Sequence, residues 1–120
     1  MKANTVALVG RADKSRTLIA KYLRDGGYEV FECEDLAVAS HLFGVVIVDD
    51  AEPSEATRVR VESWLRLAKS PRVVVISSKP SGWKALSRAH SDDVYVLAAP
   101  AFGWEIVDAL RATPPMLPHA

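Results

Sequence analysis

The chain has 120 residues, of which 49% are apolar and 25% are charged, and its 15 basic and 15 acidic residues cancel. This composition predicts one soluble globular domain with a sizeable core and argues against disorder. The balanced charge excludes a basic nucleic-acid-binding surface, and no apolar run is long enough to span a membrane. With no signal peptide and a single cysteine, Cys33, the sequence predicts a cytoplasmic protein without disulfides, metal ions or other cofactors.

The pattern of apolar residues alternates between strands and helices along the chain. Runs of β-branched residues predict strands that are buried on both faces, and apolar residues spaced three or four apart predict helices. The predicted strands are Thr5–Val9, Tyr28–Cys33, Val45–Asp49, Val73–Ser77 and Val94–Leu97. The predicted helices are Lys14–Arg24, Leu36–Phe43, Ser54–Ala68, Ser81–His90 and Phe102–Ala112. This alternation with short turns predicts the α/β class, with a doubly wound five-stranded parallel sheet.

Three details of this pattern bear on the domain's limits and surfaces. Residues 1–112 are predicted to form the domain, and the three prolines of residues 113–120 predict an exposed tail or linker stub. The alternation in Arg58–Val61 leaves a strand open within the third predicted helix. Asp13 is the predicted N-cap of the first helix and Ser81 that of the fourth. The apolar stripe predicted for the first helix consists of Leu18, Ile19, Tyr22 and Leu23.

The third predicted strand ends abruptly in two carboxylates, Asp49 and Asp50. In open α/β sheets, ligands bind outside the carboxyl ends of the strands, so both residues are candidates for a functional site. Aspartate is also a common turn residue, and a purely turn-forming role stays open for both.

Several motifs occur in the order and at nearly the spacing found in one family. Leu-Arg-Asp-Gly-Gly-Tyr-Glu-Val (Leu23–Val30) leads into the second strand, and Val-Ile-Val-Asp-Asp-Ala-Glu-Pro (Val46–Pro53) forms the third strand and its loop. Ser77 closes the fourth strand, and Ala-Pro-Ala-Phe (Ala99–Phe102) follows the fifth. Together these motifs resemble the receiver domain of bacterial two-component response regulators, which implies a flavodoxin-like or CheY-like (βα)5 fold. The resemblance implies that Asp49 is at the phospho-acceptor position and Ser77 at the switch hydroxyl.

The chain departs from this family where the family binds magnesium and phosphate. Gly10 and Arg11 stand in place of the acidic pair that holds the magnesium ion, and Ala99, before Pro100, replaces the phosphate-binding lysine. Without these groups, the negative charges of Asp49 and an incoming phosphoryl group are not neutralised. We therefore expect an atypical receiver, a pseudo-receiver that is not an enzyme and acts without magnesium-dependent phosphotransfer. Arg11 is predicted either to be solvated or to pair with Asp49 or Asp50 in the cation site.

Three aromatic residues, Trp83, Tyr95 and Trp104, indicate a protein partner. In receiver-like folds, the face built from the fourth helix, fifth strand and fifth helix is the usual dimer or effector surface, and aromatic residues are frequent at interfaces. The expected partner is a kinase, an output domain, an adaptor or a second copy of the chain, and neither nucleic acid nor a membrane. Packing inside the domain is the alternative for the tryptophans. Tyr95 also lies one residue from the family's aromatic position, which turns it to the other face of the sheet.

Two other functions stay open. The domain is either a receiver still phosphorylated on Asp49, which regulates an output domain or partner, or a flavodoxin-like domain that binds a flavin or small anion where the first helix begins. Gly10–Ser15 joins a strand to a helix and contains Lys-Ser, but it lacks the second glycine of a phosphate-binding loop.

Overall fold

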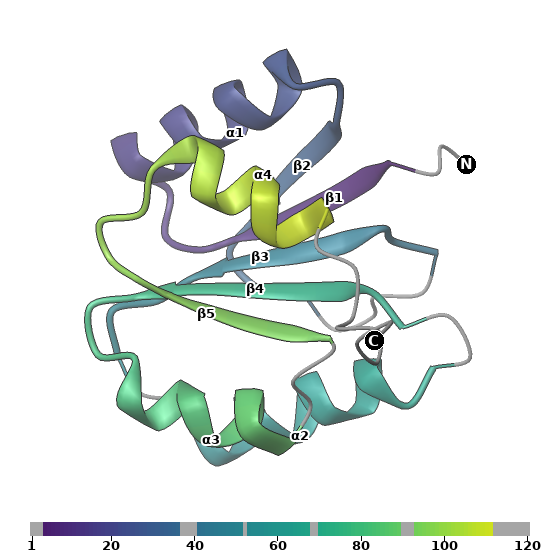
Figure 1. Cartoon of the computed structure of the whole chain (residues 1–120), viewed down its shortest axis with the longest axis vertical. Helices are drawn as coiled ribbons and strands as arrows, with labels where there is room; N and C mark the ends of the chain where they lie inside the picture. The colour runs from purple at the N-terminus through teal and green to yellow at the C-terminus, as the bar shows by residue number, and fades with distance from the viewer. Residues whose placement is uncertain (1–3, 37–40, 52, 68–69, 90–92, 112–120) are drawn as a thin grey trace, which may run out of the picture.

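Five parallel strands form a single sheet in the order β2-β1-β3-β4-β5, which confirms the predicted fold class (Figure 1). The computed structural model describes residues 4–36, 41–51, 53–67, 70–89 and 93–111. The strands are β1 (Thr5–Val9), β2 (Glu29–Cys33), β3 (Gly44–Val48), β4 (Arg72–Ser77) and β5 (Val94–Ala98). The helices are α1 (Lys14–Asp25), α2 (Glu55–Leu65), α3 (Ser81–Ala89) and α4 (Gly103–Arg111).

The helices cover both faces of the sheet, with α1 and α4 on one side and α2 and α3 on the other (Figure 1). Alternate strand residues contribute to two separate cores. In β4, for example, Val74 and Ile76 pack towards α1 and α4, whereas Val73 and Val75 pack towards α2 and α3. Burial on both faces explains the continuous β-branched runs of the central strands. Because all strands are parallel, their carboxyl ends lie at one edge of the sheet.

Side-chain caps fix where two of the helices begin. The carboxylate of Asp13 accepts a hydrogen bond from the backbone N–H of Arg16 at 2.9 Å, as predicted. Ser54 caps α2 in the same way through Thr57, and the strand left open in this segment is absent because Arg58–Val61 is helical. Ser81 is not a cap, because the carbonyl of Pro80 accepts the first backbone hydrogen bonds of α3.

The connection between β2 and β3 differs from the predicted pattern. Leu36 and residues 41–43 are not helical, and residues 37–40, the centre of the predicted helix Leu36–Phe43, lie outside the described residues. The described part of the chain therefore has four helices and not five. The predicted tail, residues 113–120, also lies outside the described part.

Candidate functional site

Asp49 and Asp50 directly follow the central strand β3 and lie at the carboxyl edge of the sheet. Asp49 is half-buried and Asp50 is exposed. Beside them is a cavity of about 390 Å³, whose polar and charged lining includes Gly10, Arg11, Asp13, Glu34, Asp49 and Asp50. The structure therefore brings together the four residues that the sequence assigned to the acidic pocket, Gly10, Arg11, Asp49 and Asp50.

Both aspartates are engaged in local turns. The Asp49 carboxylate accepts a hydrogen bond from the backbone N–H of Ala51 at 2.9 Å. The Oγ of Ser78 lies 3.4 Å from the Asp50 carboxylate and 3.5 Å from the Asp50 carbonyl oxygen. Ser78 was missed by the sequence analysis. The only available signal was a second serine after β4, and the spacing does not show which serine faces the acidic edge.

Arg11 does not occupy the position of a bound cation. Its side chain is exposed, and among the described residues no ion pair joins it to Asp49 or Asp50. The expectation that Arg11 pairs with one of these carboxylates is therefore wrong, and its alternative, a solvated arginine, holds. The β1–α1 loop carries the Arg11 side chain to the open mouth of the pocket, where water competes for both charges.

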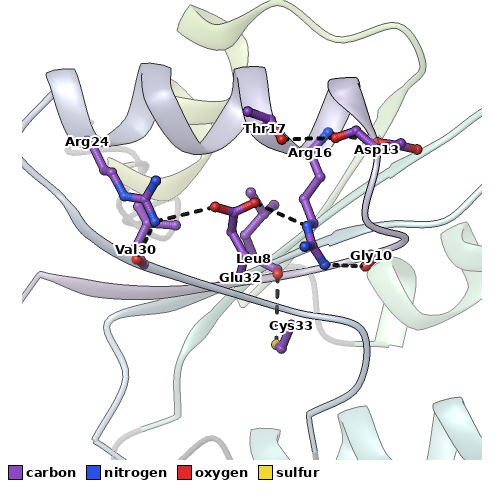
Figure 2. A network of polar contacts seen from close by, with 9 residues as sticks. All are labelled: Leu8, Gly10, Asp13, Arg16, Thr17, Arg24, Val30, Glu32 and Cys33. Atoms are coloured by element: carbon purple, nitrogen blue, oxygen red, sulfur yellow. Dashed lines mark hydrogen bonds and ion pairs between the residues drawn. The ribbon is translucent and has the colours of Figure 1, made fainter.

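A different arginine fixes the β1–α1 loop. Arg16, in the first turn of α1, donates from Nη1 to the carbonyl oxygen of Gly10 at 2.9 Å and from Nε to the Glu32 carboxylate at 3.2 Å (Figure 2). The second carboxylate oxygen of Glu32 lies 3.5 Å from Nη2 of Arg24, which also donates to the Val30 carbonyl. Glu32 thus lies between two arginines of α1, and the chain around Gly10 is held to that helix.

Cys33 is next to this network, and its Sγ lies 3.8 Å from the Leu8 carbonyl oxygen (Figure 2). Burial raises the pKa of the Cys33 thiol, although the positive charge of Arg16 acts in the opposite direction. A raised pKa leaves less thiolate at neutral pH, so Cys33 fits a packing role better than a nucleophilic one.

Gly10 is buried at the end of β1, where space is limited. A Cβ atom at this position would lie 3.1 Å from the Val48 carbonyl oxygen and 3.3 Å from the Val48 Cβ. Any side chain here would force β3 to move by a few tenths of an ångström. The backbone is therefore closely packed at Gly10, and a side chain there requires β3 to shift.

The predicted switch positions make structural contacts. Ser77 is fully buried, and its Oγ accepts a hydrogen bond from the backbone N–H of Lys79 at 3.0 Å. The backbone N–H of Ala99 donates to the Ser77 carbonyl at 2.9 Å, and the Ala99–Pro100 peptide bond is cis. The hydroxyl of Ser77 thus satisfies the backbone where β4 ends.

The three aromatic interface candidates lie in different environments. Trp83 is fully buried between α3 and the sheet, and its Nε1 donates to the Ala51 carbonyl at 3.0 Å. The expectation that Trp83 is at a surface is therefore wrong, because Trp83 lies with Leu86 on the side of α3 that faces the core. Tyr95 is half-buried on the opposite face with α1 and α4, as its register predicted, and its hydroxyl lies 3.3 Å from Nη1 of Arg72. Trp104 is 59% exposed.

Comparisons with known proteins show a likeness in structure only. No protein-family model and no curated protein sequence matches the chain. The chain is similar to a pilus assembly-related protein from Burkholderia pseudomallei, with a TM-score of 0.68 and 21% identity over 92% of this chain and 90% of that one. It is also similar to the receiver domain of the hybrid histidine kinase CckA, with a TM-score of 0.62 and 18% identity over 89% and 95% of the two chains. The chain has a receiver-like fold. Among the described residues, no helix is both long and apolar enough to cross a bilayer.

The residues at the acidic edge do not fit the magnesium ion that the receiver resemblance implies. Magnesium requires oxygen ligands in near-octahedral geometry. Gly10 offers no side-chain oxygen, Arg11 adds a positive charge at the mouth, and one Asp49 oxygen already accepts the Ala51 N–H. Within the part of the chain that the structure describes, no three acidic, histidine or cysteine side chains are grouped as a metal site. We therefore assign no step to a metal ion.

Proposed function

We propose that this receiver-like domain is a pseudo-receiver, a cytoplasmic module of bacterial signalling that acts through protein contacts and without magnesium-dependent phosphotransfer. The observation that carries the proposal is the set of residues around Asp49. A phosphoryl group on Asp49 would add negative charge to a pocket lined by Asp13, Glu34 and Asp50. The uncharged Gly10 and Ala99 stand where the receiver resemblance requires charged groups, and Arg11 is unpaired within the described chain. This arrangement opposes phosphoryl transfer electrostatically.

The contacts of the acceptor loop, Asp49–Pro53, support the same proposal. The buried indole of Trp83 holds the Ala51 carbonyl, two residues after Asp49. The buried hydroxyl of Ser77 is already used by the backbone of Lys79. A switch needs two states of similar free energy. Here the bond from Trp83 would have to break for the loop to rearrange, and the bond from Lys79 would have to break for the end of β4 to rearrange. We infer that one conformation dominates and that the domain presents a constant surface.

Exposure to a small phosphodonor tests the proposal. The purified domain is incubated with acetyl phosphate and magnesium, and its intact mass is measured alongside that of Asp49→Ala. We expect no phosphoryl adduct on either protein. An adduct that Asp49→Ala removes would contradict the proposal and would support a receiver that is phosphorylated on Asp49.

Partner binding gives an independent readout. Asp49→Ala and Asp49→Asn should leave binding to partner proteins within about twofold of the unchanged chain, because no step depends on that carboxylate. Loss of binding by folded Asp49→Ala would show that the acidic pocket does carry the signal. A yellow chromophore or a bound anion that co-purifies with the domain would instead support the flavodoxin-like alternative.

The likeness to a pilus assembly-related protein favours one setting for these contacts. The alignment covers nine-tenths of each chain and has the higher of the two TM-scores. We propose pilus assembly as a second candidate function, in which the domain is a scaffold. Deletion of the gene in its native host should then remove surface pili, and restoration with Asp49→Ala should return them. Normal piliation after deletion would exclude this setting.

A further inference from the structure

Four large apolar side chains gather on the surface of α1 and the start of α4. Leu18 is 67% exposed, Tyr22 46%, Phe102 65% and Trp104 59%. Leu18 and Tyr22 belong to the apolar stripe predicted for α1, of which only Ile19 and Leu23 pack into the core, together with Ala20. We call these four exposed residues the α1–α4 patch.

Direct contacts make the patch continuous. The Tyr22 ring lies against Gly103, so closely that a Cβ atom there would be 2.6 Å from the ring. On either side of this glycine, Phe102 and Trp104 stack with their ring centroids 6.3 Å apart and their planes 7° from parallel. Leu18 is one helical turn before Tyr22. Gly103 is therefore the point at which the two helices share a single apolar surface.

The aromatic part of the patch is held in place before any partner binds. Glu105 accepts a hydrogen bond from the backbone N–H of Phe102 at 3.0 Å, and the Phe102 carbonyl accepts from Glu105 and Ile106 as α4 begins. These bonds cap the helix and fix the backbone that carries both rings. Rigid aromatic side chains lose little entropy on association and are typical anchors of interfaces.

The patch is as large as the largest apolar patch of a typical monomer, a size at which such patches are often functional. At ~200 Å² for each fully exposed side chain, the exposed fractions of the four residues correspond to roughly 470 Å² of surface. That is somewhat more than half of the ~800 Å² that one partner contributes to a stable protein interface. The polar residues that surround the patch must supply the remainder.

The charges beside the patch identify the partner. On α1, the exposed Lys14 and Lys21 lie three or four residues from Leu18. On α4, Glu105 and the exposed Asp108 lie within one turn of Trp104. Asp25, exposed one turn after Tyr22, offsets one of the two lysines, so the α1 side of the patch keeps a net positive charge, whereas the α4 side is acidic. The α1 side of one molecule therefore complements the α4 side of another. In a dimer with two-fold symmetry this contact forms twice, and the apolar patches of both copies are covered.

We propose that the α1–α4 patch is the surface through which a second copy of this chain binds. This inference rests on one part of the proposed function, namely that the domain acts through protein contacts. This surface differs from the one predicted from sequence, because Trp83 is buried and Tyr95 is half-buried, and only Trp104 is shared by both.

Sedimentation velocity of the full chain over a wide concentration range tests the proposal. We expect a reversible monomer–dimer equilibrium. Leu18→Glu and Trp104→Lys should each weaken dimerisation at least tenfold. The matched control is Val59→Lys, since Val59 is 58% exposed on α2, which lies on the opposite face of the sheet. A chain that stays monomeric throughout, or equal effects of the control and patch variants, would overturn the proposal.

Charge reversal distinguishes a second copy from a different partner. Lys21→Asp and Asp108→Lys should each weaken dimerisation several-fold, and the double variant should recover it, because the reversed charges meet across the two-fold axis. Circular dichroism establishes that each variant is folded. A double variant no better than the single ones would overturn a contact between α1 and α4 of two copies.

The same assay separates this inference from the proposed function. Dimerisation should be unchanged by Asp49→Ala and by magnesium with beryllofluoride, a phosphoryl analogue. A dimer that forms only with the analogue would contradict the phosphorylation-independent function but uphold the patch. A monomer whose mass never changes with acetyl phosphate would uphold the function and overturn the patch.

Discussion

Replacing Trp83 with phenylalanine should destabilise the domain by about 2 to 3 kcal/mol. The Trp83 side chain is fully buried, and its Nε1 is 3.0 Å from the Ala51 carbonyl oxygen. The smaller ring leaves a cavity and loses apolar contacts, which costs about 1 to 2 kcal/mol. The lost hydrogen bond costs about 1 kcal/mol and no more, because Ala51 is exposed and water can replace the indole.

Urea unfolding followed by circular dichroism measures this loss. With a denaturant dependence of about 1 to 3 kcal/mol per molar urea, the midpoint should fall by roughly 0.7 to 3 M. Trp104→Phe is the control, because Trp104 is 59% exposed, and it should change the free energy of unfolding by less than about 0.5 kcal/mol.

The same variant probes the acceptor loop. Amide hydrogen exchange at Ala51 and its neighbours should accelerate in Trp83→Phe, since the indole no longer holds the loop. A change of less than about 0.5 kcal/mol in the free energy of unfolding would refute the reasoning. So would unchanged exchange at Ala51, because both results would mean that Trp83 does not hold the loop.

Three further predictions concern the neighbouring charges. Arg16→Ala should lower the free energy of unfolding by about 2 kcal/mol, because it breaks the bonds to Gly10 and Glu32. Arg24→Ala removes a more exposed ion pair and should lower it by less than about 1 kcal/mol. Urea unfolding compares the two variants, and equal losses would contradict the assigned roles. Burial raises the pKa of the Cys33 thiol, so its contribution to stability is complete below the ordinary value of 9.0 and is lost as pH rises through the higher pKa of the folded state. Unfolding curves measured above pH 9.0 should show this loss and Cys33→Ala should lack it; identical pH profiles would exclude it. Arg11→Asp adds a carboxylate at the exposed mouth of the acidic pocket. Calorimetry should then detect saturable magnesium binding to this variant and none to the unchanged chain. Binding by both proteins would show that the unchanged pocket already holds the ion.

Much of the fold could be predicted from sequence because burial on both faces of a parallel sheet leaves an unmistakable pattern. The β-branched run Val45–Val48 predicted a central strand, and the carboxylates after it were therefore expected at the edge of the sheet. Alternation along β5 also predicted the face of Tyr95 correctly, since a shift of one residue reverses the side. The helix predicted for Leu36–Phe43 is not present in the described residues of this segment. A short apolar run without capping residues does not determine the type of secondary structure.

The candidate site was less predictable because it depends on which side chains the loops bring together. Arg11 and Arg16 are both close in sequence to the acidic edge, but only Arg16, on the rigid first turn of α1, makes the ordering contacts. Trp83 and Trp104 both lie in the first three residues of a helix, and sequence does not show that one faces the core and the other solvent. The exposure of Leu18 and Tyr22 depends on how α1 is rotated over the sheet.

Tryptophan fluorescence of the Trp104→Phe variant tests the central claim most directly. This variant lacks the exposed indole and keeps two buried ones, Trp64 and Trp83. Of these, Trp83 reports on the loop after Asp49 through its bond to Ala51. Titration with magnesium and beryllofluoride should produce no saturable change in emission, because the pocket does not hold the ion and the loop is fixed. A saturable change that Asp49→Ala abolishes would show that the acidic edge is a working phosphoryl switch and would contradict the account.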